Sequence, residues 1–179
     1  MKWIFTVSGI ILSATFAFAE GTPDPPAEPI ESLPIRIQQP GRYRLSSSLQ
    51  YADARGAAIS IEADHVTIDL NGHALTGSAG AESLARGIHA QNRTNITITN
   101  GRIEGFYFGA DLRGDATENA PPSSSHVVSN VCFKGNWYFG VRVMGADSEI
   151  RNCQIFATGG CSRADHTIPH AARLVGERN

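Results

Sequence analysis

The sequence has few cysteines and, after its first residues, no long hydrophobic run. Its three cysteines, Cys132, Cys153 and Cys161, are too few and odd in number to form the disulfide framework of a small secreted domain, although a single bridge stays possible. After residue 19, no segment approaches the roughly 18 consecutive apolar residues of a transmembrane helix. These absences exclude a disulfide scaffold and predict no stable membrane insertion of the mature chain.

The chain also lacks an excess of positive charge. It has 15 Lys and Arg against 17 Asp and Glu, a formal net charge of −2. Proteins that bind nucleic acid generally carry a basic surface that neutralises phosphates, so the composition argues against a nucleic-acid partner. Among the six histidines, only His166 and His170 have a close ligand spacing, and Pro169 between them disfavours a helical pair. We therefore expect no metal site and no cofactor.

The first residues have the pattern of a secretory signal peptide. Lys2 supplies a positive start, an apolar run follows, and Ala17-Phe18-Ala19 fits an A-x-A cleavage site. We predict that residues 1–19 are a signal peptide. The mature protein is then secreted or periplasmic.

Proline is concentrated just after this segment. Six of the nine prolines lie between Pro23 and Pro40, and the stretch GTPDPPAEP shows no hydrophobic periodicity. Such sequences form extended, mobile chain rather than packed structure. We predict a Pro-rich leader over residues 20–34, with ordered structure beginning near Ile35.

Short alternating segments recur along the rest of the chain. Each unit holds alternating apolar residues on two successive segments, then a turn asparagine and a further apolar residue. The asparagines recur at intervals of 29, 30 and 22 residues: Asn71, Asn100, Asn130 and Asn152. This pattern predicts three short strands in each unit. A strand of four or five residues buries only two side chains, so no unit can fold alone.

Stacking the units on one another solves this problem. Equivalent residues then lie about 4.8 Å apart, with aliphatic columns inside and turn asparagines that hydrogen-bond their copies in neighbouring units. An antiparallel sandwich also has regularly spaced short strands, but it gives no reason for asparagine to recur at a fixed offset from an apolar residue. The sequence therefore favours an all-β parallel β-helix over residues 35–160, with about four coils of three short strands.

Four segments carry a resemblance to a known family: SLPIRIQQPGRYRLSSSL, ISIEADHVTIDLNGHALTG, GIHAQNRTNITITNGRIEGF and GVRVMGADSEIRNCQIFATGG. In these segments the chain resembles the secreted right-handed parallel β-helix repeat proteins of the pectin-lyase-like superfamily. The resemblance implies a right-handed, single-stranded β-helix. It implies no single activity, because the superfamily includes polysaccharide lyases, hydrolases, epimerases, phage tailspikes and adhesins.

Outward-facing residues on the first strand of each coil form one column: Ser60, His89, Asp111 and Arg142. Superfamily enzymes are similar in placing acidic and basic residues on a strand face. This similarity implies acid/base roles for His89 and Asp111, with Arg142 contacting a uronate carboxylate. The same column also fits an ordinary cross-strand ladder of favourable polar pairs. Ser60 beside His89 and Asp111 suggests a triad, for which the sequence shows neither a pocket nor an oxyanion hole.

Two other chemistries find no support in the sequence. No coil carries the aspartate cluster that resembles the Ca²⁺ sites of pectate lyases, or the close aspartate pair of hydrolases of this fold. Glycoside hydrolysis requires two carboxyl groups about 5 to 9 Å apart, and only remote combinations such as Asp64 with Asp69 come near this arrangement.

Aromatic residues gather in the segments GFYFGADL and GNWYFGVRV, at equivalent corners of neighbouring coils. One interpretation is corner packing that covers the stack, because large aromatics dominate packing energetics. The other is that Tyr107, Trp137 and Tyr138 form a platform for carbohydrate binding.

The C-terminal residues 161–179 show no strand alternation. We predict a non-repetitive tail and a truncated solenoid whose last coil, with Val141, Ile150 and Ile155, is an open edge that favours self-association. The functional prediction is an exported β-helix that binds a polysaccharide, a cell-surface glycan or another surface partner. The alternatives are a polysaccharide lyase or glycosidase-like enzyme acting on uronate-containing polymers, or a non-functional fragment of one.

Overall fold

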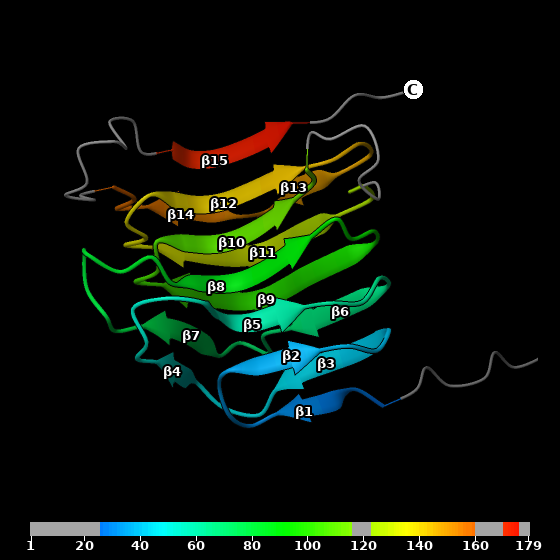
Figure 1. Ribbon diagram of the computed structural model, residues 1–179, viewed down its shortest axis with the longest axis horizontal. Coiled ribbons are helices and arrows are strands. Elements are labelled where there is room, and N and C mark those ends of the chain that lie inside the picture. The colour runs from blue at the N-terminus through cyan, green and yellow to red at the C-terminus, as the bar shows by residue number, and fades with distance from the viewer. Residues whose placement is uncertain (1–25, 116–122, 160–169, 176–179) are drawn as a thin grey trace, which may run out of the picture.

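The computed structural model describes residues 26–115, 123–159 and 170–175. These residues form strands and connecting turns, with no helix among them (Figure 1). The strands stack in parallel as a solenoid of about four turns. The predicted all-β parallel solenoid is therefore confirmed, while its handedness stays a prediction.

Sheet B forms one wall of the solenoid. Each of its strands pairs in parallel with the equivalent strand of the next coil. In spatial order they are β2 (Ile35–Ile37), β5 (Ala57–Ile61), β8 (Arg86–Gln91), β10 (Phe108–Arg113), β12 (Phe139–Met144) and β15 (His170–Val175).

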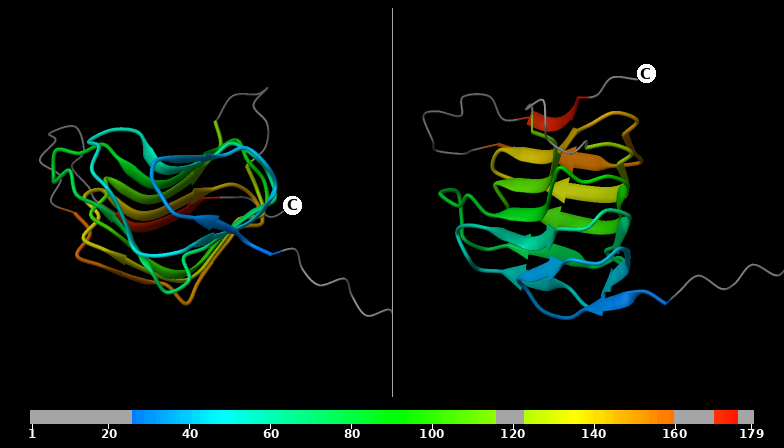
Figure 2. Two further views of the ribbon diagram at one scale, coloured as in Figure 1. Left: turned by 90° about the horizontal axis from the view of Figure 1, so that it is seen from below. Right: turned by 45° about the vertical axis from the view of Figure 1, so that its right-hand side comes forward.

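Sheet A forms the other two walls. Its main path is β1 (Glu28–Ile30), β3 (Gly41–Leu45), β6 (Val66–Asp69), β9 (Ile96–Glu104), β11 (Val127–Lys134) and β13 (Glu149–Arg151). Strands β9 and β11 continue round a corner, and their second halves pair with β7 (Ala74–Gly77) and β14 (Gln154–Phe156). Strand β4 (Leu49–Tyr51) pairs with β7. Each complete coil thus contributes to three walls, as predicted, and the coils superimpose when viewed along the stack (Figure 2).

The predicted corner asparagines turn the chain through a left-handed backbone conformation. The φ angle is 54° at Asn71, 60° at Asn100, 56° at Asn130 and 51° at Asn152. Asparagine adopts this region more readily than most residues other than glycine, because its short polar side chain bonds locally. Backbone conformation therefore explains why asparagine recurs at this corner.

The predicted hydrogen bonds between stacked asparagine side chains are wrong for the first two corners. Asn71 Nδ2 donates to the carbonyl of Leu45 (3.2 Å), and Asn100 Nδ2 donates to Asp69 Oδ1 (3.3 Å). The two corners differ in length: β6 and β7 are joined by residues 70–73, whereas the paired residues of β9 are joined by 100–101 alone. The side chains of Asn71 and Asn100 are consequently out of register.

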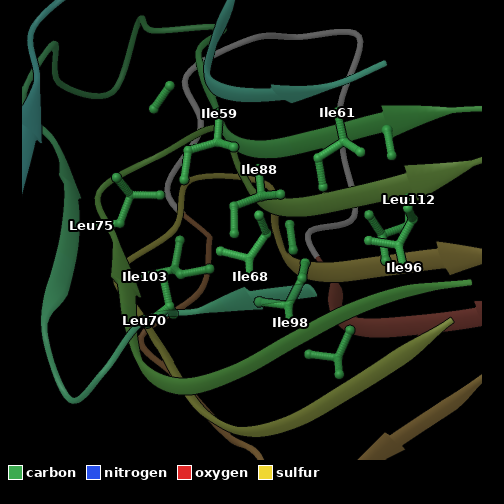
Figure 3. Packing of buried hydrophobic residues seen from close by; sticks show 14 of the residues in the cluster. Ile59, Ile61, Ile68, Leu70, Leu75, Ile88, Ile96, Ile98, Ile103 and Leu112 are labelled. Carbon is green, nitrogen blue, oxygen red and sulfur yellow. The ribbon is translucent and has the colours of Figure 1, made fainter. Parts of the chain in front are cut away.

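Aliphatic columns fill the interior. The register pairs Ile68 with Ile98, Ile98 with Val128, and Val128 with Ile150, which confirms the predicted column. The first three have no exposed surface, and Ile150 packs against them from the last coil. Figure 3 shows side chains of both sheets meeting in this one core. Burying each such side chain contributes about 1.5 to 3 kcal/mol, so the stack supplies what a single coil cannot.

Two strands lie where the sequence analysis placed none. Strand β1 falls in the predicted leader and pairs with β3, with Ile30 fully buried opposite Leu45. Strand β15 falls in the predicted tail and extends sheet B beyond β12. The predicted limits of 35 and 160 are therefore too narrow, because apolar residues outside them find partners on the neighbouring coil. The predicted signal peptide, residues 1–19, lies outside the described residues.

The C-terminal end of the described solenoid carries exposed apolar side chains. Phe156 is 46 % exposed, Leu174 50 % and Val175 43 %. These residues lie on β14 and on β15, the outermost strand of sheet B. Self-association through this end stays a prediction.

Two cysteines lie in the described part of the chain, and both are free thiols. Cys153 packs against the core, and Cys132 is partly exposed. Cys161 lies outside the described residues.

Candidate functional site

The outer surface of sheet B carries the polar column that the sequence predicted. The parallel register aligns Ser60, His89, Asp111 and Arg142 on consecutive strands. It also adds an arginine at each end, Arg36 on β2 and Arg173 on β15.

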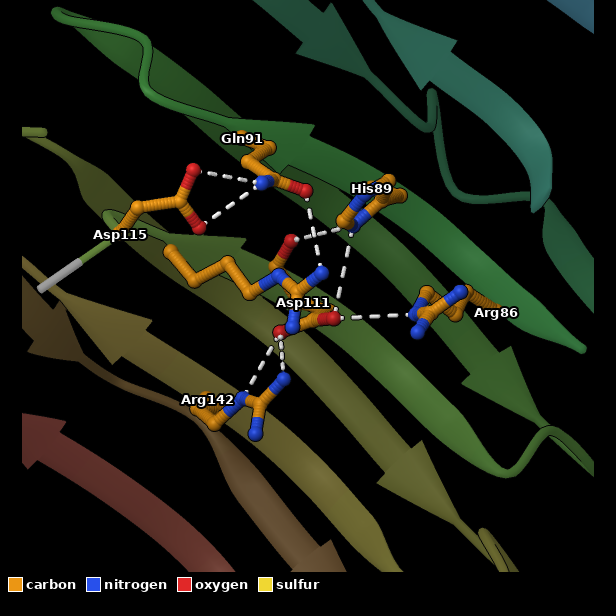
Figure 4. A network of polar contacts seen from close by, with 7 residues as sticks. Arg86, His89, Gln91, Asp111, Asp115 and Arg142 are labelled. Carbon is orange, nitrogen blue, oxygen red and sulfur yellow. Dashed lines mark hydrogen bonds and ion pairs between the residues drawn. The ribbon is translucent and has the colours of Figure 1, made fainter. Parts of the chain in front are cut away.

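Asp111 lies at the centre of this column and has no exposed surface. Its Oδ1 accepts from Arg142 Nε (2.8 Å) and lies 2.7 Å from Arg142 Nη2. Its Oδ2 accepts from Arg86 Nε (3.0 Å), and His89 Nδ1 is 3.4 Å away (Figure 4). Two guanidinium groups therefore enclose one carboxylate, and the cluster retains a net positive charge.

Burial alone would raise the pKa of the Asp111 carboxyl. The hydrogen bonds from His89 and Arg142 and the charge of Arg142 outweigh burial, and the pKa is lowered from its ordinary value. Asp111 is thus ionised at neutral pH, and its oxygens are occupied. An enclosed, ionised carboxylate does not reach a ligand on the surface, so the geometry favours a holding role for Asp111 over the predicted acid/base role.

The contacts of His89 fix its tautomer. His89 Nδ1 lies 3.2 Å from the main-chain carbonyl of Asp111 and 3.4 Å from its carboxylate. Both are acceptors, so Nδ1 carries the proton and the neutral ring keeps a lone pair on Nε2. Nε2 has no hydrogen-bond partner among the described residues, which leaves it available as a base.

Aromatic rings flank the charged cluster. Phe108 and Phe139 stack with centroids 5.3 Å apart, and the Arg142 guanidinium lies 4.3 Å from the Phe108 centroid. Each ring precedes a glycine, Gly109 or Gly140, at which a Cβ would lie 2.4 Å or 2.6 Å from a carbonyl oxygen of the next coil. Glycine at these positions permits the close stacking of sheet B.

A hollow of about 330 Å³ opens beside the cluster on the outer surface of sheet B. Its polar lining consists of Arg36, Tyr51, Ser60, Glu62, Arg86 and His89. Of the predicted catalytic residues, only His89 lines the hollow. Asp111 lies behind His89 and Arg86, and Arg142 lies on the far side of Asp111.

Arg86 is the member of the site that the sequence analysis missed. Its side chain is 29 % exposed, and only its Nε is bonded to Asp111, so the rest of the guanidinium is open to the hollow. Arg86 was not part of the predicted outward column, whose member on the same strand β8 is His89. A repeated tripeptide could have identified it. Strands β8, β10 and β12 each begin with a large residue, then glycine, then an aliphatic residue: Arg86-Gly-Ile, Phe108-Gly-Ala and Phe139-Gly-Val.

The predicted carbohydrate platform is brought together only in part. Tyr107 and Tyr138 stack with centroids 5.1 Å apart and an interplanar angle of 17°, but Tyr107 is only 4 % exposed. Trp137 and Tyr138 pack, partly exposed, against the cluster of Tyr107, Phe108 and Phe139. The two tyrosines cover one face of each other's rings, and this favours the corner-packing interpretation for Tyr107.

A second Ser-His pair lies at the corner before β11. His126 has no exposed surface, and burial lowers its pKa to about 4, although the charge of Asp64 acts in the opposite direction. Its Nδ1 accepts from the main-chain N–H of Ile96 (3.4 Å), so Nε2 carries the proton and donates to Ser123 Oγ (2.9 Å). A ring that already donates to the serine cannot take the proton of that hydroxyl, so this pair is structural.

No group of three or more potential metal ligands occurs among residues 26–115, 123–159 and 170–175. The same residues form no helix of the length and apolarity needed to cross a membrane. Comparison of the chain with family models, curated proteins and solved structures finds no match. The geometry and charge of the site therefore support the function proposed below.

Proposed function

We propose that the protein is an exported member of the pectin-lyase-like superfamily that binds an acidic polysaccharide on the outer surface of sheet B. The observation that carries the proposal is the charge of that sheet. Its strands hold five arginines, Arg36, Arg86, Arg113, Arg142 and Arg173, against the single carboxylate of Asp111. This excess of positive charge occurs in a chain whose formal net charge is −2.

The arrangement of the arginines fits a ligand that is an anionic polymer. The arginines lie on five of the six strands of sheet B, and neighbouring strands are about 4.8 Å apart, so an extended chain along the stack meets several of them. Arginine suits this task because its planar guanidinium binds a carboxylate through two parallel hydrogen bonds. The hollow beside Arg36 and Arg86 offers one recessed position on an otherwise flat wall.

Retention of the mature chain on immobilised polymers tests the proposal. We expect retention on polygalacturonate, weaker retention as salt rises, and none on neutral dextran, because the attraction is electrostatic. Equal retention on both polymers, or retention on neither, would contradict the proposal.

A lyase is the second candidate, and the open Nε2 of His89 favours it. An uncharged imidazole beside Arg86 can remove a proton next to a uronate carboxylate while the arginine stabilises the developing charge. A glycosidase is less well supported, because Glu62 is the one carboxylate that lines the hollow and its oxygens are bound by Arg36 and Gln38. Incubation with polygalacturonate separates the functions. Unsaturated products that disappear in His89→Ala would establish the lyase, and binding without products supports a binding module.

A further inference from the structure

Ser60 and His89 occupy neighbouring positions in the hollow, and the proposed polysaccharide binding assigns neither of them a role. They are paired in the parallel register of β5 and β8, which places adjacent outward residues about 4.8 Å apart. Both line the hollow. Ser60 Oγ has no hydrogen-bond partner among the described residues, and neither has His89 Nε2. The Ser60 hydroxyl and the His89 imidazole thus line one hollow from neighbouring strands.

We infer that Ser60 and His89 are the nucleophile and the general base of an esterase site for short acyl esters. Asp111 contacts His89 Nδ1 from behind, so the ring presents Nε2 rather than Nδ1 to the hollow. The guanidinium of Arg86 lines the same hollow and can donate to an oxyanion. Nucleophile, base, a group that orients the base and an anion donor therefore come together at one place.

The reaction is a two-step acyl transfer to water. Ser60 Oγ attacks the ester carbonyl carbon while its proton passes to His89 Nε2. The carbon–oxygen bond to the leaving alcohol then breaks, and that alcohol takes the proton from His89. Water attacks the acyl-Ser60 ester with His89 again as base, releases the carboxylic acid and restores the serine. No metal, oxidant or other co-reactant is required.

The Ser123–His126 pair shows why the first pair is distinctive. In both pairs a serine and a histidine are close, but His126 donates to Ser123 through Nε2, whereas His89 donates through Nδ1 towards Asp111. His126 is also fully buried, while His89 is partly exposed in the hollow. Only the Ser60–His89 pair combines an accessible hydroxyl with an accessible lone pair. Ser123 therefore serves as an internal negative control.

A fluorophosphonate probe tests the inference on the mature chain, because it reacts covalently with an activated serine. Peptide mass spectrometry after labelling identifies the modified residue. We expect modification of Ser60 and not of Ser123, no labelling in Ser60→Ala, and labelling slowed by about 100-fold or more in His89→Ala. The matched control Thr67→Ala, on the outer side of β6 in sheet A, should label as fast as the unmodified protein.

Folding of each variant is checked by circular dichroism. His89→Gln covers the case in which His89→Ala unfolds, since an amide can still donate to Asp111 but cannot act as a base. Release of p-nitrophenol from p-nitrophenyl acetate should follow the same order among the variants. A folded protein that is not labelled at Ser60, or is labelled equally fast without the imidazole, would overturn the inference. No glycan is present in either assay, so failure of polysaccharide binding would not affect the outcome.

Discussion

The outer surfaces of sheet A and sheet B belong to the same coils but differ in their charges. The strands of sheet A carry five basic and four acidic residues, and those of sheet B carry five arginines and one aspartate. On sheet A, Arg44 Nε binds Asp69 Oδ2 at 3.2 Å with side chains 49 % and 17 % exposed. On sheet B, Asp111 is fully enclosed between Arg86 and Arg142.

This difference separates what the fold requires from what it leaves free. Stacking constrains the inward residues, because they must fill the shared core. The outward residues alternate with them and tolerate almost any side chain. The basic and acidic residues on the strands of sheet A nearly balance, whereas sheet B carries more arginines than Asp111 and the neighbouring Glu62 can neutralise. This excess therefore points to a ligand.

The largest effect is expected in the core that the two sheets share. Ile98→Asp places an unpaired charge in the core and should destabilise the fold by at least about 5 kcal/mol, enough to prevent folding. Thr97→Asp, on the outer side of the same strand β9, should leave a folded protein. Thermal unfolding of the two variants measures the difference. Similar midpoints would mean that the inward and outward assignments are wrong.

The next effect contrasts one carboxylate on each sheet. Asp111→Ala leaves the partly buried guanidinium groups of Arg86 and Arg142 without their counter-charge, which should cost about 3 kcal/mol. Asp69→Ala removes a pair with the half-exposed Arg44 and the hydrogen bonds from Asn71 and Asn100, and should cost about 1 to 2 kcal/mol. Urea denaturation at neutral pH gives both values. Equal losses would show that the cluster on sheet B is no more than a surface ladder.

Acid should affect the buried side chains of His126 and Asp111 differently. The pKa of His126 is about 4 in the fold against an ordinary 6.5, so the unfolded chain takes up a proton first. Stability should therefore fall as pH drops from about 6.5 to 4, by about 3 kcal/mol. The pKa of Asp111 is lowered from 3.8, so its contribution is present above that pH and is lost only at lower pH.

Urea denaturation between pH 7 and pH 4.5 isolates the histidine, because Asp111 stays ionised throughout. His126→Gln should remove the slope in this range, whatever its effect on stability at pH 7. A slope that persists in the variant would place the acid sensitivity elsewhere. It would also contradict the neutral, buried state of His126.

Alternation and repetition were enough to predict the solenoid, its columns and the alignment of Ser60, His89, Asp111 and Arg142. All three follow from the local pattern, because parallel stacking fixes the register once the inward residues are known. The burial of Asp111 could not be predicted in the same way. It depends on where the long Arg86 and Arg142 side chains fold back, and these directions depend on Phe108 and Phe139 beside them.

The strands at the ends were missed for a related reason. The sequence HAARLV of β15 follows that of FGVRVM in β12, with a small residue at the second position and an arginine at the fourth. The repeats were recognised by their corner asparagines, and HAARLV belongs to none of the four asparagine repeats. Repeats defined by the small residue rather than by the asparagine would have included both β15 and Arg86.

Charge reversal on each sheet tests the central claim most directly. Arg36 on sheet B and Arg44 on sheet A are matched controls, because each is an exposed arginine paired with a carboxylate of the next coil, Glu62 at 3.4 Å and Asp69 at 3.2 Å. Affinity for oligogalacturonate is measured for Arg36→Glu and Arg44→Glu, which have the same net charge. We predict that Arg36→Glu loses about tenfold or more, equal to about 1.4 kcal/mol, and that Arg44→Glu binds like the unmodified protein. Equal losses would mean that overall charge, and not the surface of sheet B, determines binding.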